Sequence, residues 1–393
     1  MPELPIKDKT AIAGIGWSPF SRNSGTTVLN LTAQASLMAI DDAGLKPNDI
    51  DGIVTYYWRP DTPGPREIAE AMGIHRINFE LNNQGGGGWA SAAVMSAALA
   101  VYSGVCSNVL VYRAMNGRSQ RRPTAAAASR GSEGPLQFSA PYGNMHAAAS
   151  FGHYATAHMA KFGTSTLDFA HLAVTQRKHA SLNKKAIMRE LITVEDHQNS
   201  RWVVYPFRLL DCCLDSDCAV AMVVTSAERA RDMKQAPVYI MSMMGGCEPF
   251  PNNYTTYGAI AAPQLYAGAG ITPKDVDVAE LYDPFTMMCM LHMEDFGLVP
   301  KGEVGGWVRE GRNALDGGGV PVNTHGGLLS ECYAQGLNHV IEAVQQLRPG
   351  GVVDDLCEGP HTYDRTTCRQ VRDPQVALTC GEGGQSSLLL RRA

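Results

Sequence analysis

A run of four glycines marks the place where this chain could bind a negatively charged group. Residues 85–88 follow the polar stretch Asn82-Asn83-Gln84, and an apolar, alanine-rich run over 89–102 comes directly after them. Glycine costs the most backbone entropy to order, so the run interrupts regular structure, whereas the apolar run predicts a buried helix. A glycine turn at a helix start exposes backbone N–H groups and the positive end of the helix dipole. Such a turn binds an anion or oxyanion, or is only a tight packing turn, and the run by itself favours neither.

Several strands and helices must position this turn. Apolar runs predict strands over 10–16, 50–56, 108–112 and 217–225, and apolar residues at helical spacing predict helices over 29–42, 67–72, 150–162 and 166–180. This alternation is typical of an α/β protein. The polar stretch 116–141, rich in Arg, Ala, Ser and Gly, indicates an excursion from the core.

An internal repeat divides the chain. Ala-Gly-Leu-Lys-Pro-Asn-Asp-Ile-Asp at 43–51 matches Ala-Gly-Ile-Thr-Pro-Lys-Asp-Val-Asp at 269–277. Each copy follows a predicted helix and precedes a predicted strand. The flanking strands also recur in order, 11–15 with 238–241, 108–112 with 375–379 and 219–225 with 387–391. The repeat predicts two similar halves with parallel-rich mixed sheets and buried helices between them.

Composition excludes several classes of protein. The chain has 393 residues, of which 45% are hydrophobic and 18% charged, and its formal charge of −5 gives no reason to expect nucleic acid as a partner. No apolar run reaches the roughly 18 residues of a membrane span, and the N-terminus lacks a secretory pattern, so we expect a cytoplasmic protein. Ten cysteines occur without a C-x-x-C pair, which predicts reduced thiols and no metal site.

Four motifs resemble those of the thiolase superfamily. Asp-Cys-Cys-Leu-Asp-Ser-Asp-Cys-Ala-Val-Ala-Met at 211–222 resembles the motif that closes the first half of a thiolase, and Glu-Leu-Tyr-Asp-Pro-Phe at 280–285 resembles the Asn/His-Glu/Asp-x-Phe motif. Asn-Thr-His-Gly-Gly at 323–327 resembles Asn-x-x-Gly-Gly, and Cys-Gly-Glu-Gly-Gly at 380–384 resembles Cys-x-Gly. The motifs cover nearly the whole chain, and the most similar branch is that of the sterol-carrier-type or lipid-transfer thiolases.

The resemblance implies a thiolase-like α/β fold with two pseudo-symmetric halves, each with a five-stranded mixed sheet, around buried central helices. Residues 1–230 would form the first half, with a loop domain inserted at about 117–205, and residues 231–393 the second. The family is generally dimeric, so we expect a homodimer. Members of this branch commonly work with a small zinc-ribbon/OB-fold partner, so we also expect a hetero-oligomer such as a heterotetramer.

The departures from the family pattern indicate a different reaction. The nucleophilic cysteine of a thiolase falls here at Gly85, which excludes covalent acyl transfer through that position. The imidazole of the Gly-His-Pro segment falls at Tyr333, and the Asn/His of the middle motif falls at Tyr282. This pattern is similar to the thiolase-like aldolases of bacterial steroid side-chain degradation, which cleave a β-hydroxyacyl-CoA to a ketone and a shorter acyl-CoA.

Retro-aldol cleavage fits these residues. It needs a base for the hydroxyl proton, donors for the enolate oxygen and an acid for the carbon, and a tyrosine serves as a base when ionised or as an acid when neutral. The resemblance thus implies a carbon–carbon lyase that releases acetyl- or propionyl-CoA, with a CoA thioester as substrate and no cofactor bound by this chain. The expected oxyanion and substrate pocket comprises Gly85, Gly86, Gly326, Gly327 and Gly381.

Further candidates follow from the same resemblance. Tyr254 and Tyr257 lie in the loop 247–262, which covers the active site in this family, and either is a second acid/base or an ordinary loop tyrosine. We expect Asp283 to hold backbone or a neighbouring ring in place. His325 is as readily structural as catalytic, and Cys380 is either an acid on the enolate side or an inert buried thiol.

Four arginines offer a site for the phosphates of CoA. They cluster at and after the end of the predicted strand 108–112, and their guanidinium groups suit a 3′-phosphate and a pyrophosphate. A solvated loop or a contact with another subunit explains them equally well. These residues are Arg113, Arg118, Arg121 and Arg122.

Two rival functions stay open. The first is a thiolase or acyltransferase that uses another cysteine, such as Cys380 or Cys332, although the glycine at the elbow argues against it. The second is a non-catalytic subunit that binds acyl-CoA or lipid as a scaffold. Gly85 alone would fit a scaffold, but loss of function need not create matched phenols at Tyr282 and Tyr333.

Overall fold

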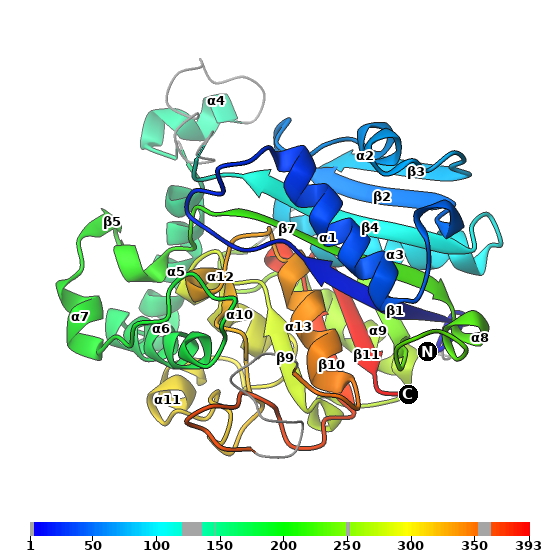
Figure 1. Ribbon diagram of the computed structural model, residues 1–393. Coiled ribbons are helices and arrows are strands. Elements are labelled where there is room, and N and C mark those ends of the chain that lie inside the picture. The colour runs from blue at the N-terminus through cyan, green and yellow to red at the C-terminus, as the bar shows by residue number, and fades with distance from the viewer. Residues whose placement is uncertain (1–3, 120–135, 145, 249–251, 353–362) are drawn as a thin grey trace.

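The computed structural model describes residues 4–119, 136–144, 146–248, 252–352 and 363–393 (Figure 1). Its strands are β1 Thr10–Trp17, β2 Gly52–Tyr57, β3 Phe79–Gln84, β4 Asn108–Asn116, β5 Trp202–Val204, β6 Phe207–Arg208, β7 Asp217–Ser226, β8 Val238–Gly245, β9 Val278–Leu281, β10 Val376–Cys380 and β11 Ser386–Arg391. Its α-helices are α1 Val28–Asp42, α2 Pro65–Met72, α3 Ala90–Tyr102, α4 Leu136–Ser139, α5 Ala147–Phe162, α6 Thr166–Ser181, α7 Val194–Asn199, α8 Ala227–Ala230, α9 Gly258–Ala269, α10 Thr286–Asp295, α11 Val304–Arg309, α12 Gly327–Ser330 and α13 Leu337–Leu347. Short 3-10 helices are η1 Pro47–Asp49, η2 Gly86–Trp89, η3 Ala140–Tyr142, η4 Leu209–Asp211, η5 Pro273–Asp275 and η6 Glu382–Gly384.

The strands of the two halves join in one mixed sheet. Its nine strands run in the order β3-β2-β4-β7-β1-β8-β11-β10-β9, with five from the first half and four from the second. The halves meet where β1 and β8 pair antiparallel, Ala11 opposite Tyr239 and Ile12 opposite Val238. The duplicated α/β architecture is confirmed, but the expectation of two separate five-stranded sheets is wrong in this detail.

The fifth strand of the second half is reduced to a single bridge. Val322 pairs parallel with Ala279 of β9, at the place that β3 holds beside β2 in the first half. Pro321 cannot donate to a strand ladder, and Asn323 adopts a left-handed conformation with φ of 51°. These two neighbours end the strand after one residue and turn the chain toward the segment that carries Tyr333.

The repeat found in the sequence forms the same structure twice. The helix α1 leads through η1 into β2, and α9 leads through η5 into β9. The last aspartate of each copy accepts hydrogen bonds from two backbone N–H groups at the start of the next parallel strand, Asp51 at β4 and Asp277 at β10, with distances of 2.8–2.9 Å. Each copy therefore fixes the register of a parallel pair in its own half.

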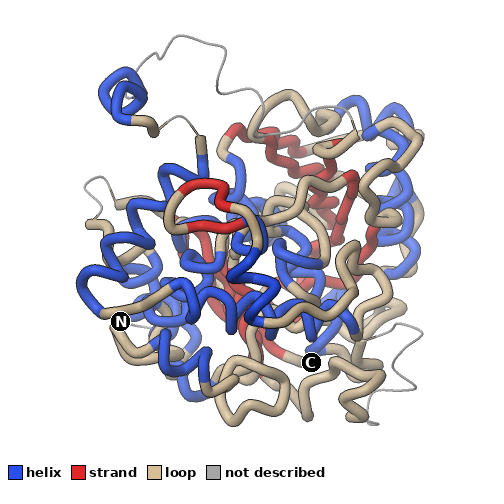
Figure 2. The backbone as a smooth tube through the Cα atoms, turned by 90° about the vertical axis from the view of Figure 1, so that its left-hand side faces the viewer, coloured by secondary structure: helices blue, strands red, loops and turns tan. Residues whose placement is uncertain are grey.

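Two buried helices lie between the halves of the sheet. The helices α3 and α13 contact strands of both halves and share one apolar cluster with them. On the outer faces, α1 and α2 cover the first half, and α9 and α10 cover the second. Figure 2 shows helices on both sides of the strands. The layered core thus places the starts of α3 and α13 near each other.

The segment between β4 and β7 holds the inserted helices. Its helices α5 and α6 pack against α10, α11 and α12 of the second half, and β5 and β6 form a separate small hairpin. In Figure 1 the helices α5, α6 and α7 lie on the left, beside α10, α11 and α12, and α4 lies above them. Among the residues with described structure, no helix combines the length and apolar character needed to cross a membrane.

Candidate active site

A pair of hydrogen-bonded phenols lies at the centre of the site. The hydroxyl oxygens of Tyr282 and Tyr333 are 3.1 Å apart. Tyr282 has no exposed surface, whereas Tyr333 is partly exposed. The two tyrosines that the sequence analysis selected thus form one unit, with Tyr333 as the member that solvent reaches.

Short backbone segments position the two phenols. Tyr282 directly follows β9, and Tyr333 lies between α12 and α13. Asp283 Oδ1 accepts a hydrogen bond of 2.9 Å from the Leu328 N–H at the start of α12, and the Tyr333 N–H donates to Ser216 Oγ at 3.0 Å. Asp283 therefore fixes the backbone that leads to Tyr333, which is the holding role expected for it.

The glycine turn lies against the phenol pair. A Cβ atom on Gly87 would fall 2.1 Å from Tyr282 Oη, so only a glycine allows the turn to come this close. The Gly85 N–H donates to the Tyr57 carbonyl oxygen, whereas the N–H groups of the next glycines start a helix and have no intrahelical acceptors. They therefore offer donors beside the phenols, and the glycine next to the two named in the sequence analysis makes the closest approach.

The elbow position itself faces an aromatic ring. A Cβ on Gly85 would lie 2.0 Å from Cδ1 of the Trp89 indole. The space that a nucleophilic side chain would enter is filled by Trp89 in this arrangement. The site therefore has neither a nucleophile at the elbow nor room for one without moving the indole.

A third segment, the turn between β10 and β11, completes the site. A Cβ on Gly381 would fall 2.7 Å from the Gly87 carbonyl oxygen, and Ser386 Oγ donates to the Gly88 carbonyl at 2.7 Å. This turn carries Glu382, whose carboxylate contributes to raising the pKa of both Tyr282 and Tyr333. The charge of Glu382 therefore acts on the phenol pair.

Sequence reasoning missed Glu382. It occupies the position at which the Cys-x-Gly motif has its glycine, inside a segment quoted only for its cysteine. A charged residue in place of that glycine was the available signal.

Burial sets the protonation of these groups. It is the main cause that raises the pKa of Tyr282 and Tyr333 above the usual value of a phenol, so both stay neutral at neutral pH. Burial also raises the pKa of Glu382, to about 7. The glutamate is thus the member of this cluster that exchanges a proton near neutrality.

The buried thiols are poor nucleophiles. Burial raises the pKa of Cys380 and of Cys332 above the usual range of a thiol. Because the thiolate is the reactive form, neither is suited to acyl transfer at neutral pH. Cys380 lies on β10 next to the turn of Glu382 and has only 1% exposed surface.

His325 belongs to a buried ionic cluster behind the site. Its Nδ1 lies 2.9 Å from Glu280 Oε2, and its Nε2 lies 3.7 Å from Glu331 Oε2. Burial alone would lower the pKa of His325, but the carboxylates of Glu331 and Glu280 raise it to about 9. A charged, internally paired imidazole favours a structural role over a catalytic one.

The same cluster offers donor atoms of the kind that bind metals. Atoms of Glu280, His325 and His339 lie within 4.8 Å of one another, all buried. The sequence analysis found no such set, because it considered spacing along the chain. The contact between Glu280 and His325 already pairs their charges, so no metal ion is needed to balance the charges of this cluster.

Arg113 does not lie where a CoA phosphate could reach it. Its side chain has no exposed surface, and its Nε donates to Gln335 Oε1 at 2.8 Å while Nη2 donates to Asp61 Oδ2 at 3.0 Å. Its proposed role as a phosphate ligand is therefore wrong, and it instead holds Gln335, two residues after Tyr333. The backbone N–H of Arg118 donates to Asp217, and Arg121 and Arg122 lie outside the described residues.

The loop tyrosines and the second glycine pair each have near neighbours other than the two phenols. Lys161 Nζ lies 4.1 Å from the ring centroid of Tyr254, and the Tyr257 hydroxyl lies against Gly246. Cβ atoms on Gly326 and Gly327 would collide with Ala180 and with Asp283 respectively, so these glycines face the interior. Their position favours support of the Tyr333 segment over contact with substrate.

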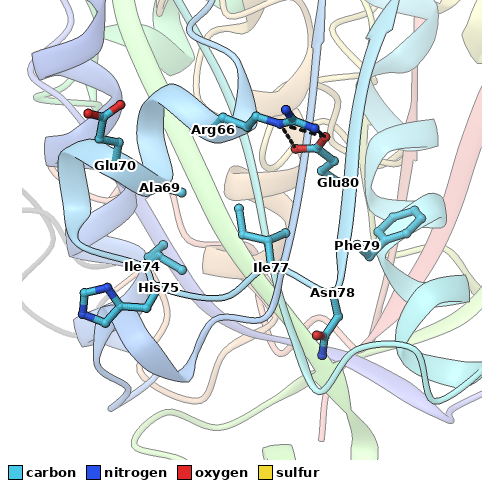
Figure 3. A pocket seen from close by; sticks show the side chains of 9 residues that line it. All are labelled: Arg66, Ala69, Glu70, Ile74, His75, Ile77, Asn78, Phe79 and Glu80. Atoms are coloured by element: carbon cyan, nitrogen blue, oxygen red, sulfur yellow. Dashed lines mark hydrogen bonds and ion pairs between the residues drawn. The ribbon is translucent and has the colours of Figure 1, made fainter.

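A surface hollow at the edge of the sheet is separate from this site. It lies between α2 and β3, where Arg66 and Glu80 form an exposed ion pair of 2.8 Å (Figure 3). Ile74, Ile77 and Phe79 supply its apolar part. Its residues come from the outer edge of the first half, whereas the phenols belong to the second half.

Comparisons with known proteins identify the family of this chain. A family model for the thiolase C-terminal domain matches residues 250–388. The chain is 42% identical over 361 residues to the 17-hydroxy-3-oxo-4-pregnene-20-carboxyl-CoA lyase of Mycobacterium tuberculosis, covering 87% of this chain and 92% of that protein. It is 39% identical over 368 residues to the steroid side-chain-cleaving aldolase of Thermomonospora curvata, covering 88% of this chain and 93% of that one.

A solved structure supports the same family assignment. The Ltp2-ChsH2(DUF35) aldolase superposes with a TM-score of 0.85 at 35% identity, covering 98% of each chain. With a thiolase-like fold, no nucleophile at the elbow and these relatives, the chain belongs to the thiolase superfamily, in the branch of the steroid side-chain-cleaving aldolases, and is a carbon–carbon lyase.

Proposed function

We propose that this enzyme cleaves the CoA thioester of a steroid carboxylic acid that carries a tertiary hydroxyl on the β-carbon. The relative from Mycobacterium tuberculosis is named for a 17-hydroxy-20-carboxyl-CoA substrate. Retro-aldol cleavage of such a compound breaks the bond between C17 and C20. The products are a 17-ketone and propionyl-CoA, and no free CoA is consumed.

The observation that carries the proposal is the phenol pair beside a side-chain-free turn. Tyr282 and Tyr333 share a hydrogen bond of 3.1 Å, and Gly87 brings backbone donors against them. In the proposed reaction, the partly exposed Tyr333 contacts the substrate hydroxyl and Tyr282 stabilises its charge changes. The N–H groups of the glycine turn hold the thioester oxygen as it becomes an enolate, since the Gly381 N–H of the opposite turn already donates to the Ser386 carbonyl oxygen at 2.8 Å.

The rival reactions fit the site less well. A thiolase needs a thiolate, whereas burial raises the pKa of Cys380 and Cys332 and position 85 is a glycine. A scaffold subunit needs no paired phenols at the junction of three loops. Both rivals would give no cleavage of a β-hydroxyacyl-CoA in the absence of free CoA.

The assembly is part of the proposal. The solved aldolase is named together with ChsH2(DUF35), which supports a DUF35-type partner, of zinc-ribbon/OB-fold architecture, for this chain. The strand β3 lies at the end of the sheet order, with one edge left for pairing. We propose that two copies of the chain meet at this edge and that the partner completes a heterotetramer.

The test is cleavage followed by mass spectrometry. The full chain, alone and co-expressed with a DUF35-type partner, is incubated with 17-hydroxy-3-oxo-4-pregnene-20-carboxyl-CoA. We expect the ketone and propionyl-CoA without added CoA. Tyr333→Phe should lower kcat by at least about 100-fold, because it removes the acid/base hydroxyl and little else.

Tyr254→Phe is the matched control, since that ring lies beside Lys161 and not in the phenol pair. Its turnover should stay within about two-fold of the wild type. Full turnover by Tyr333→Phe, or cleavage only of a β-ketoacyl-CoA with free CoA, would contradict the proposal.

A further inference from the structure

We propose that Gln335 is a further donor to the thioester oxygen, and that its side-chain amide shares the developing enolate charge with the backbone N–H groups of the glycine turn. The inference rests on the proposed retro-aldol function and names a residue that stabilises its transition state. The amide is bonded at its oxygen and unbonded at its nitrogen, and this difference directs its two N–H bonds.

The oxygen of the Gln335 amide is bound to a buried cation. Arg113 Nε donates to Gln335 Oε1 at 2.8 Å, and the Arg113 side chain has no exposed surface. Asp61 Oδ2 accepts from Nη2 at 3.0 Å, while Nη1 donates to Thr62 and to the Ala114 carbonyl oxygen, so the guanidinium is held on several sides. Because a guanidinium group only donates, the amide oxygen must face Arg113 and the amide nitrogen must face away from it.

The nitrogen of the same amide lies against the glycine turn. A Cβ atom on Gly86 would fall 3.7 Å from Gln335 Nε2, which is an ordinary contact distance. The next glycine, Gly87, is the one whose Cβ position lies 2.1 Å from Tyr282 Oη. Within the described part of the chain, Gln335 Nε2 has no hydrogen-bond partner. Its two N–H bonds therefore remain available at the turn, beside the glycine that contacts the phenol pair.

The segment that carries Gln335 packs on the phenol pair. Gln335 follows Tyr333 by two residues, and a Cβ on the next residue, Gly336, would fall only 2.6 Å from Cδ2 of the Tyr282 ring. The backbone of Gln335 is left-handed, with φ of 49°, and its carbonyl oxygen accepts from Tyr56 Oη at 3.0 Å. A left-handed backbone is uncommon for a residue with a side chain, and such conformations cluster at functional sites. The surrounding bonds thus fix both the backbone and the amide of this residue.

A substrate can reach this side of the turn. The Trp58 indole borders the same Gly86 position at 3.1 Å and is 50% exposed, whereas Gln335 is only 3% exposed. The amide is therefore shielded from bulk water but lies next to a residue at the surface. A fixed donor in a site that excludes water stabilises charge more than the same donor does in water.

The amide suits a developing enolate and not the substrate hydroxyl. Because its oxygen is occupied, it offers only N–H donors and cannot accept the hydroxyl proton. When the C–C bond breaks, its electron pair forms the enolate of the thioester, and the amide donates to the charged oxygen while keeping its own protons. A cation bonded to the amide oxygen also polarises the N–H bonds. Burial raises the pKa of Tyr333, and the charge of Arg113 is among the smaller influences that oppose this rise, so the charge acts within the site.

Gln335→Glu is the test, and Gln345→Glu is its matched control. A glutamate keeps a partner for Arg113 but replaces the N–H donor with a carboxylate oxygen. Gln345 is equally buried, at 3% exposure, and its Oε1 also accepts from a cation, Lys185 Nζ at 2.7 Å. Each variant is assayed as the full chain with a DUF35-type partner on 17-hydroxy-3-oxo-4-pregnene-20-carboxyl-CoA. Gln335→Glu should lose at least about 100-fold in kcat with KM changed by less than about three-fold, and Gln345→Glu should stay within about three-fold of the wild type in both.

A second readout isolates the enolate. The enzyme is incubated with propionyl-CoA in D₂O, and deuterium at the α-carbon is measured by mass spectrometry. The wild type should exchange this hydrogen through the enolate, and Gln335→Glu should slow the exchange by at least about 100-fold. Gln335→Gly is a second variant, because glycine adopts a φ of 49° without strain and the chain should fold. It should lose at least about ten-fold in kcat, since it removes the donor without adding a charge.

The outcomes separate the two proposals. If the wild type cleaves the substrate and either Gln335→Glu or Gln335→Gly cleaves and exchanges as fast, the role of Gln335 is wrong and the aldolase function stands. Equal losses in Gln345→Glu would also overturn that role, because a carboxylate at any buried amide would then have the same effect. If the wild type neither cleaves nor exchanges, the proposed function fails and the role of Gln335 fails with it. Both losses in Gln335→Glu, with unaltered thermal unfolding, support the inference.

Discussion

The helices α3 and α13 hold equivalent places in the two halves of the molecule, but they bury different kinds of side chain. The buried residues of α3 are alanine, valine and one serine, Ser91. Every residue of α13 is buried, and these include His339, Glu342 and Gln346. Buried polar groups require partners, so α13 is tied to its surroundings by several directed bonds, whereas α3 is held mainly by packing, with one contact of 3.4 Å between Ser91 Oγ and Thr379 Oγ1.

The difference matches what each half supplies to the site. The loop before α3 provides backbone N–H groups without side chains, whereas the loop before α13 provides Tyr333. Thr324 Oγ1 lies between two buried carboxyl groups, 2.6 Å from Glu342 Oε1 on α13 and 2.7 Å from Glu280 Oε1, and Arg369 forms an ion pair with Glu342. The polar helix thus anchors the segment that carries the phenol, and the apolar helix needs only to support a turn.

Removing the central carboxylate of the polar helix should have the largest effect. Glu342→Ala leaves Arg369 buried without this partner, and breaking a buried ion pair costs about 3–5 kcal/mol in the free energy of unfolding. Val94→Ala on α3 should cost about 1–3 kcal/mol, since it only deletes buried methyl groups. Urea unfolding at pH 7 measures both. A smaller loss in Glu342→Ala than in Val94→Ala would contradict the distinction between the helices.

The pH dependence of stability should follow His325. Its pKa is about 9 in the folded state and 6.5 as an ordinary imidazole, so the stabilisation is fully present below pH 6.5 and is lost as pH rises through about 9. A shift of this size corresponds to about 3 kcal/mol. Urea midpoints from pH 6 to 10 should fall in the wild type, and the fall should be smaller in His325→Gln. Equal slopes in the two proteins would refute the assignment.

A methyl group on the glycine turn should affect turnover more than stability. In Gly87→Ala the new Cβ must displace the Tyr282 hydroxyl, which lies 2.1 Å from the Cβ position. We expect kcat to fall by about 100-fold, or about 2.7 kcal/mol of transition-state stabilisation. Gly306→Ala on α11 is the control, because a Cβ there meets no atom within 4 Å. Wild-type turnover in Gly87→Ala would show that the contact is unimportant.

Where the two halves are alike, the same substitution in each half should have the same effect on stability, and this effect should be smaller than those above. Asp51→Ala and Asp277→Ala each remove a carboxylate that accepts from two backbone N–H groups at a strand start. Each should lower the free energy of unfolding by about 1–3 kcal/mol. Thermal or urea unfolding of both variants measures these losses. A difference of more than about 2 kcal/mol between the two losses would show that the two aspartates are not equivalent.

The elements that sequence could predict are those with a local signal. The strand β7 is a continuous apolar run, and the nine-residue repeat predicted a helix before and a strand after each copy, which are α1 and β2 in the first half and α9 and β9 in the second. The strand β3 gave no such signal, because three consecutive polar residues, Asn82 to Gln84, form half of this edge strand and every second side chain is exposed to solvent. The join between β1 and β8 depends on contacts between the halves, which no local pattern encodes.

Site residues could be predicted where a sequence motif marked their position. They could not be predicted where the role of a side chain depends on neighbours from distant segments. The alignment of motifs selected Tyr282 and Tyr333, which are 51 positions apart in sequence and bonded in the structure. Arg113 carries a charge at a strand end, which suggested a ligand for phosphate, but Asp61 and Gln335 cover it from distant segments. Glu382 went unnoticed because the two phenols on which its charge acts come from other parts of the chain.

The glycine turn has a consequence for how this enzyme can change over evolutionary time. Each of its four residues is crowded by a different neighbour, and each neighbour would have to move before a side chain could appear. The contacts of the four Cβ positions are Gly85 with Trp89 at 2.0 Å, Gly86 with Trp58 at 3.1 Å, Gly87 with Tyr282 at 2.1 Å and Gly88 with Gln385 at 2.5 Å. A cysteine at Gly85 would therefore have to displace the Trp89 indole, so this single substitution does not by itself place a nucleophile in the site.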